Sequence, residues 1–196
     1  DYVARMPEEQ TAIYYLPGTS RRVVEGSPQL EAFKARGVEV LYLLDPIDEF
    51  VVQGLTEFES RPLKSAAKGT VELGTAEERE QAEKERGEKA EEFSGVVLRL
   101  EKQLADHVKE VRLSSRLTES AVCLVGAEDD LSPQLERLLR QESVDVPSSK
   151  RIMEINPSHP ICARMKELHR ADAGDERLDD FAELLLGQAY LAEGAL

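Results

Sequence analysis

The sequence is short of aromatic residues, cysteine and positive charge, and the last two shortages each argue against a class of protein. It has no tryptophan, two cysteines, and 25 lysines and arginines against 39 aspartates and glutamates in 196 residues. The net charge of −14 would repel phosphate groups, which argues against a nucleic acid or an anionic membrane as partner. Two cysteines do not make a disulfide framework, so we expect a protein of the reducing cytoplasm.

The chain also lacks long apolar runs and known catalytic motifs. No run approaches the length of a membrane span, and the first ten residues, DYVARMPEEQ, do not resemble a signal peptide. There is no Walker A, GxGxxG, GxSxG or HExxH pattern, so we expect no enzymatic activity and no catalytic residue. The chain begins without methionine, and we interpret it as a fragment of a longer protein.

Histidine and cysteine are not spaced as metal ligands. His159, Cys162 and His169 fit no standard zinc pattern, and a fourth ligand is not evident. We predict instead that His159 belongs to the turn NPSHP and that Cys123, in an apolar run, is a core residue. No metal site is therefore expected.

The most informative stretch is residues 27–55, which predicts a helix, a strand and a second helix. Ser27 and Pro28 can begin the first helix, and Gly37 can end it in the left-handed conformation. The apolar run at residues 38–44 is typical of a strand covered on both faces. With a strand at residues 12–16 it predicts a parallel βαβ unit. Residues 47–55 form the second helix, and residues 58–64 would add an edge strand that tolerates Pro62.

We predict an α/β (α+β) fold in two units. Residues 1–70 form a small αβα subdomain, residues 71–92 a charged connector that is helical over part of its length, and residues 93–196 a mixed α/β domain. In the second unit we expect strands at residues 108–113, 121–125 and 152–155, and helices at residues 93–104, 131–140, 161–169 and 178–193.

An acidic cluster, Asp45, Asp48 and Glu49, directly follows the predicted strand at residues 38–44. One interpretation is a ligand or acid–base site, because open α/β sheets bind ligands at the carboxyl ends of their strands. The chain would then be a flavodoxin-like ligand-binding domain or an enzyme that uses Asp45. The interpretation we favour is that these acids cap the next helix and compensate its dipole.

Two helices of the second unit carry apolar stripes. One stripe, at i, i+4, i+7 and i+8, consists of Leu131, Leu135, Leu138 and Leu139. It either packs on its own domain, as in a purely structural scaffold, or binds a partner or an unfolded chain. The last helix is apolar around most of its circumference and should be hard to bury within one small domain. We therefore predict a symmetric homodimer through this helix, with contacts from Leu178, Phe181, Leu184, Leu185, Ala189 and Tyr190.

Four segments resemble one protein family. LEAFKARGVEVLYLLDPIDEFVVQGL at residues 30–55 is similar to the end of the middle domain of the heat-shock protein 90 chaperones, in particular the bacterial HtpG type. YVARMPEEQTAIYYLPG at residues 2–18 resembles the strand entry of the same subdomain. VKEVRLSSRLTESAVCLVG at residues 108–126 and RIMEINPSHP at residues 151–160 resemble motifs of the family's C-terminal domain. Several motifs in the family's order are a far stronger signal than one.

The resemblance implies a fragment of an ATP-dependent molecular chaperone. Residues 1–70 would be the end of the middle domain and residues 93–196 the C-terminal dimerisation domain. ATP and Mg²⁺ would bind to an N-terminal domain that this chain does not contain, and no cofactor is expected in the fragment. The implied partners are a second copy of the chain, non-native client proteins and, for the parent protein, a DnaK-type chaperone. Family members usually continue with one more short helix, so we expect a weaker dimer than that of the parent.

The family also implies where clients bind. Matched residue by residue, one client-binding surface maps onto Glu49, Phe50 and Gln53 of the middle domain. The other maps onto the stripe Leu131, Leu135, Leu138 and Leu139. Bacterial relatives carry Trp where Phe50 stands and Met where Leu131 and Leu135 stand, so client preference should differ more than client binding itself.

Overall fold

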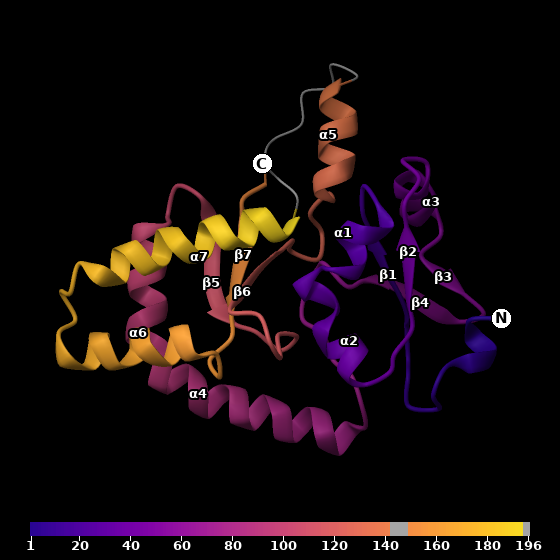
Figure 1. Ribbon diagram of the computed structural model, residues 1–196. Helices are drawn as coiled ribbons and strands as arrows, with labels where there is room; N and C mark the ends of the chain where they lie inside the picture. The colour runs from indigo at the N-terminus through magenta and orange to yellow at the C-terminus, as the bar shows by residue number, and fades with distance from the viewer. Residues whose placement is uncertain (142–148, 194–196) are drawn as a thin grey trace.

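The computed structural model describes residues 1–141 and 149–193. After a 3₁₀ turn at Val3–Arg5, the N-terminal unit contains β1 (Ile13–Pro17), α1 (Arg21–Glu25), the 3₁₀ turn Pro28–Leu30, α2 (Glu31–Ala35), β2 (Val40–Leu43), α3 (Asp48–Gly54), β3 (Glu57–Phe58) and β4 (Arg61–Ser65). Its four strands follow the order β2-β1-β4-β3, and β1 runs parallel to both β2 and β4 (Figure 1). The parallel βαβ unit expected from the sequence is therefore confirmed.

Local signals in this unit act as expected. The side chain of Ser27 accepts a hydrogen bond from the backbone N–H of Gln29 at 3.3 Å, and Pro28 occupies the first helical position. Gly37 has a φ of 65°, the left-handed conformation that ends a helix without the steric cost a side chain would add.

Two strands lie elsewhere in the sheet than predicted. β2 is an edge strand. The expectation that it is covered on both faces is wrong, because none of its four residues is fully buried and Leu41 is exposed. The predicted edge strand at residues 58–64 is a hairpin in which β4 is internal and β3 takes the edge. Pro62 is tolerated in β4 because pairing with β1 begins one residue later, at Leu63.

The C-terminal unit contains α4 (Ala76–Gln103), β5 (Val108–Leu113), β6 (Val122–Val125), α5 (Pro133–Gln141), β7 (Arg151–Ile155), α6 (Pro160–Ala171) and α7 (Arg177–Glu193). Its sheet has the order β5-β7-β6, with β7 parallel to β5 and antiparallel to β6. The core lies between this sheet and helices α4, α6 and α7, which surround it in Figure 1. The predicted mixed α/β architecture is confirmed.

Helix α4 is longer and more regular than the sequence indicated. It is one helix of 28 residues that begins at a capping box, in which Thr75 and Glu78 satisfy each other's backbone N–H groups. Its first half is charged and exposed, whereas its second half buries Phe93, Val96 and Leu100 in the core. The helix therefore runs across the domain boundary that we placed at residue 92, and that boundary stays a prediction.

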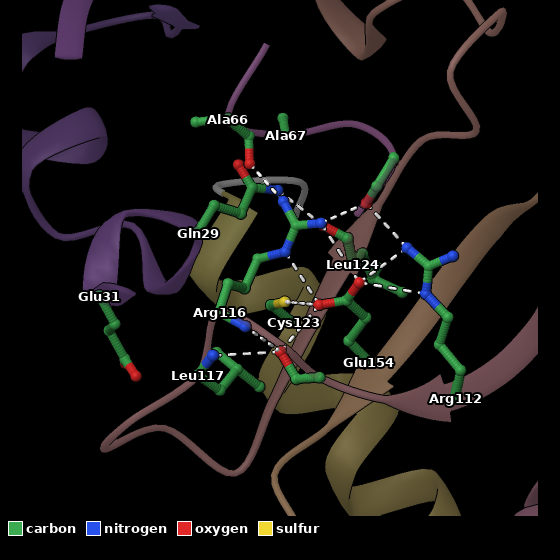
Figure 2. A network of polar contacts seen from close by, with 12 residues as sticks. Gln29, Glu31, Ala66, Ala67, Arg112, Arg116, Leu117, Cys123, Leu124 and Glu154 are labelled. Carbon is green, nitrogen blue, oxygen red and sulfur yellow. Dashed lines mark hydrogen bonds and ion pairs between the residues drawn. The ribbon is translucent and has the colours of Figure 1, made fainter. Parts of the chain in front are cut away.

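The two units are joined by a buried polar network (Figure 2). Arg116, fully buried, donates to the Oε2 atom of Glu154 at 2.9 Å and to the backbone carbonyls of Ala66 and Gly69 in the N-terminal unit. Arg112 donates to the same carboxylate at 2.8 Å. A buried ion pair is stable only when further hydrogen bonds satisfy its remaining polar atoms, and the carbonyls of the N-terminal unit do so here.

Further contacts close the junction around this network. The side-chain amide of Gln29 donates to the carbonyl of Leu124 at 2.6 Å, and residues Lys68 and Gly126 form an isolated parallel β-bridge. The carboxylate of Glu31 accepts the backbone N–H groups of residues 118, 119 and 120 at 2.6 to 3.0 Å. The two units are thus joined by a set of hydrogen bonds, a buried ion pair and a β-bridge.

Candidate functional site

Helix α3 has an inverted distribution of side chains. Surface helices normally turn apolar residues to the core and charged residues to water. In α3, whose residues are all described, the one fully buried residue is Glu49, which is 2% exposed. Phe50, by contrast, is 51% exposed. A helix that exposes apolar side chains to solvent is typical of an interaction surface.

The exposure extends beyond Phe50. Seven of the ten exposed large apolar residues in the described part of the chain fall between residues 41 and 58, and they are Leu41, Leu44, Ile47, Phe50, Val51, Leu55 and Phe58. We call the four in and beside α3, namely Ile47, Phe50, Val51 and Leu55, the α3 apolar surface. Gln53, also predicted as a contact, is exposed on the same helix.

The environment of Glu49 differs from that expected of a surface contact. Burial raises the pKa of its carboxyl group above the ordinary value, although a hydrogen bond from the Ser132 side chain and the nearby charge of Lys68 favour ionisation. Ser132 directly precedes α5, so this buried carboxylate lies where α3 meets the start of α5.

The leucine stripe of α5 is neither fully exposed nor part of the main core. Leu135 is 4% exposed, whereas Leu131, Leu138 and Leu139 are partly buried. The side chain of Ser132 caps the helix by accepting the N–H of Leu135 at 3.0 Å. Figure 1 shows α5 projecting away from both sheets. The first turn of the helix is therefore buried, and the later turns remain partly accessible.

Helix α7 divides the residues predicted for dimerisation into two groups. Leu178, Leu185 and Ala189 are fully buried in the core of their own unit, and Phe181 and Tyr190 pack partly buried against it. Leu184 is exposed, as is Leu191, which the prediction did not include. The expectation that so apolar a helix is hard to bury within one small unit holds for one face only, because α4, α6 and the sheet cover the other face.

The acids at the end of β2 are used in starting α3. The Oδ1 atom of Asp45 accepts the N–H of Ile47 at 3.1 Å, and the Oδ2 atom of Asp48 accepts the N–H of Asp45 at 3.2 Å. These bonds order the turn that leads into α3, and Asp48 lies in the first turn of the helix, but its N-cap residue, Ile47, makes no side-chain capping hydrogen bond. The flavodoxin-like alternative finds no support.

The remaining candidate residues for chemistry have structural roles. His159 is the N-cap of α6, where its Nδ1 atom accepts the N–H of Ile161 at 3.3 Å. Cys123 and Cys162 are buried free thiols, and burial raises the pKa of Cys162 to about 11, which suppresses the reactive thiolate. Over residues 1–141 and 149–193, no three His, Cys, Asp or Glu side chains gather in a way that could hold a metal ion.

Comparison with known proteins identifies the family. The sequence model of the family described as Hsp90 protein matches residues 1–195. The chain belongs to the Hsp90 family. It is 48% identical over 194 residues to the chaperone protein HtpG of Mycolicibacterium gilvum and 48% identical over 195 residues to that of Geobacter sulfurreducens. These alignments cover 99% and 100% of this chain but 30% of each relative, so the chain spans about 30% of the length of these HtpG proteins.

In this Hsp90-family chain the structure brings together part of what the sequence predicted. Glu49 of α3 meets the start of α5, whereas Phe50 and Gln53 point to the surface. Ile47, Val51 and Leu55 were not predicted from the sequence as surface residues. They follow one another at i, i+4 and i+8, a helical stripe that could have revealed them. No helix in the described residues has both the length and the apolar character needed to span a membrane.

Proposed function

We propose that this chain is the client-binding and dimerising part of an ATP-dependent, cytoplasmic chaperone of the HtpG type. In this proposal ATP and Mg²⁺ act in the N-terminal domain of the longer protein, and no residue of this chain is assigned to them. A DnaK-type chaperone is a further partner of that longer protein. The chain itself works by binding apolar segments of non-native proteins and by pairing with a second copy.

The observation that carries the proposal is the exposed α3 apolar surface. Full burial of a side chain such as Phe is favourable by about 1.5–3 kcal/mol relative to its exposure to water. Apolar segments of an unfolded protein can bury such a side chain by binding over it. Phe50 is half exposed, and Ile47 and Val51 are exposed with it, so several such contacts are available at once. The surface needs no chemistry beyond reversible apolar contact.

A matched pair of substitutions tests client binding. Phe50→Ser removes the aromatic ring from the α3 apolar surface, and Leu98→Ser removes a still more exposed apolar side chain from α4, which serves as the control. Binding of a permanently unfolded, reduced and alkylated α-lactalbumin is measured by fluorescence anisotropy. We expect about tenfold weaker binding for Phe50→Ser, because one apolar contact is lost, and no change for Leu98→Ser. Equal effects would show that the binding is not localised on α3.

The α5 stripe is tested at its accessible end. Leu139→Asp places a charge on a partly buried position, and should weaken binding of the same unfolded protein while circular dichroism stays unchanged. Leu135 is not suitable for this test because it is buried. Unfolding of the chain by Leu139→Asp would instead indicate that the stripe is core.

Dimerisation is proposed to use the exposed face of α7. Leu184 and Leu191 remain exposed there after the core side of the helix is covered. Light scattering over a dilution series should show a dimer that Leu184→Asp dissociates and that Leu98→Asp leaves intact. A chain that is monomeric at high micromolar concentration would contradict this part of the proposal.

A further inference from the structure

The buried carboxylate of Glu49 connects α3 to the first turn of α5. The Ser132 hydroxyl donates to it and at the same time accepts the N–H of Leu135, so one side chain links the carboxylate to the helix backbone. Gln134, with its amide oriented to satisfy both of its ends, donates to the Oε1 atom of Glu49 at 3.0 Å and accepts the N–H of Thr19 at 3.1 Å. Glu49 therefore contacts two of the residues that begin α5.

The loop before α5 is fixed by the same cluster. Lys68, whose charge acts on Glu49, donates to the carbonyl of Asp130, and its backbone bridges to Gly126. The Oδ2 atom of Asp130 in turn accepts the N–H of Ala127 at 2.9 Å. Residues 126–132 are thus held at both ends, and α5 starts from a defined position next to α3.

A second contact holds α5 to its own unit. Glu136, also buried, lies 3.8 Å from Arg151 of β7. Glu136–Arg151 ties the helix to the C-terminal sheet, whereas Glu49 ties it to the N-terminal unit. An isolated helix of nine residues is not stable in water, so its orientation depends on such contacts. A carboxylate at its N-terminus is also favoured by the helix dipole.

We propose that Glu49 is a positioning residue that docks the start of α5 on α3 and so sets the placement of the α5 stripe relative to the α3 apolar surface. This inference rests on the proposed function, in which these two surfaces bind the client together. Glu49 supports client binding without touching the client, because its side chain is covered by protein on all sides.

Hydrogen exchange tests the docking directly in the 196-residue chain. Glu49→Ala removes the acceptor of Ser132 and Gln134, and we expect the amides of Leu135 and Glu136 to exchange about tenfold faster. Amides in β5, β6 and β7 should keep their protection. Glu49→Gln retains an acceptor oxygen and should restore slow exchange in α5. Unchanged protection of α5 in Glu49→Ala would overturn the proposal.

A double-mutant cycle separates positioning from direct contact. If Glu49 acts through α5, Glu49→Ala weakens binding of reduced, alkylated α-lactalbumin, and adding it to Leu139→Asp causes little further loss. If Glu49 touches the client, the two losses multiply and exchange in α5 does not change, which would refute positioning. If the unsubstituted chain does not bind the unfolded protein, the proposed function fails, while the exchange experiment still decides whether Glu49 docks α5.

Discussion

Helices α3 and α7 are both rich in apolar residues, yet they use them in opposite ways. α7 buries Leu178, Leu185 and Ala189 in a core shared with α4, α6 and the sheet. α3 buries Glu49 and exposes Phe50. The difference lies in the neighbours, because α7 packs in the centre of its unit, whereas α3 follows an edge strand at the rim of the other sheet (Figure 1). Apolar content therefore does not by itself tell core from interaction surface.

Two buried glutamates, Glu154 in the junction between the units and Glu49 in α3, also differ in their surroundings. In the junction, Glu154 is paired with two guanidinium groups and its partner Arg116 also bonds two carbonyls (Figure 2). At the start of α3, Glu49 has neutral hydrogen-bonding partners and the more distant charge of Lys68. In the second environment, burial raises the pKa of the Glu49 carboxyl group above its ordinary value.

The largest effect is expected from breaking the buried ion pair. Arg116→Ala leaves Glu154 with Arg112 alone in a buried site, and should lower the free energy of unfolding by about 3–5 kcal/mol. Arg112→Ala should cost less, because Arg112 is partly exposed and Arg116 still pairs with Glu154. Urea unfolding followed by circular dichroism measures both. Equal losses would show that the two arginines share the pairing evenly.

A second prediction concerns the two faces of α7. Leu185→Ala opens a cavity in the core and should cost about 2–5 kcal/mol of unfolding free energy. The adjacent Leu184→Ala removes an exposed side chain and should change stability by less than about 0.5 kcal/mol. Both values come from urea titrations at a concentration where the chain is monomeric. A large loss from Leu184→Ala under those conditions would mean that the exposed face is covered within the monomer.

A third prediction compares two glycines of α4. A Cβ atom at Gly95 would lie 2.2 Å from the His169 ring of α6, so Gly95→Ala should destabilise the chain by about 1–3 kcal/mol. At Gly87 a Cβ atom meets nothing within 4 Å, and Gly87→Ala should stabilise the helix by about 0.5–1 kcal/mol. Thermal unfolding shows the opposite signs. Destabilisation by Gly87→Ala would indicate that the exposed half of α4 has a partner.

The smallest effects concern the pH dependence of two glutamates. Partial burial opposes ionisation of Glu31, but hydrogen bonds from the N–H groups of residues 118–120 outweigh it and hold its pKa below the ordinary value of 4.5. Its contribution to stability is therefore present above pH 4.5 and is lost as the pH falls through the lowered pKa. Unfolding measured across this range should show less acid sensitivity for Glu31→Gln than for the unsubstituted chain.

Glu49 should behave in the opposite sense. Its pKa is raised, so the folded state holds the proton more tightly, and stability falls as the pH rises from the ordinary value through the raised one. Glu49→Gln should therefore gain stability relative to the unsubstituted chain in this window and not below it. If the free energies of unfolding of Glu31→Gln and Glu49→Gln changed with pH in the same way, the two glutamates would not have different environments.

Much of the fold could be predicted from local patterns. The strand at residues 108–113 and the helices near residues 161–169 and 178–193 were placed within a few residues of their observed ends, because periodicity and capping residues act over short distances. The edge position of β2 and the internal position of β4 could not be predicted, since strand order depends on residues far apart in the sequence. The continuity of α4 was missed because Gly87 and a nearly apolar-free segment weaken the helical pattern.

The candidate surfaces show the same division. The sequence by itself determined the family, the α/β composition, the apolar stripes and the helix caps, all of which follow from residue type and spacing along the chain. Only the tertiary structure decided that Phe50 faces water, that Leu185 is core and that Glu49 is enclosed beside α5. The physical reason is that burial belongs to the packing of distant elements, and a helix pattern specifies which residues share a face but not what that face meets.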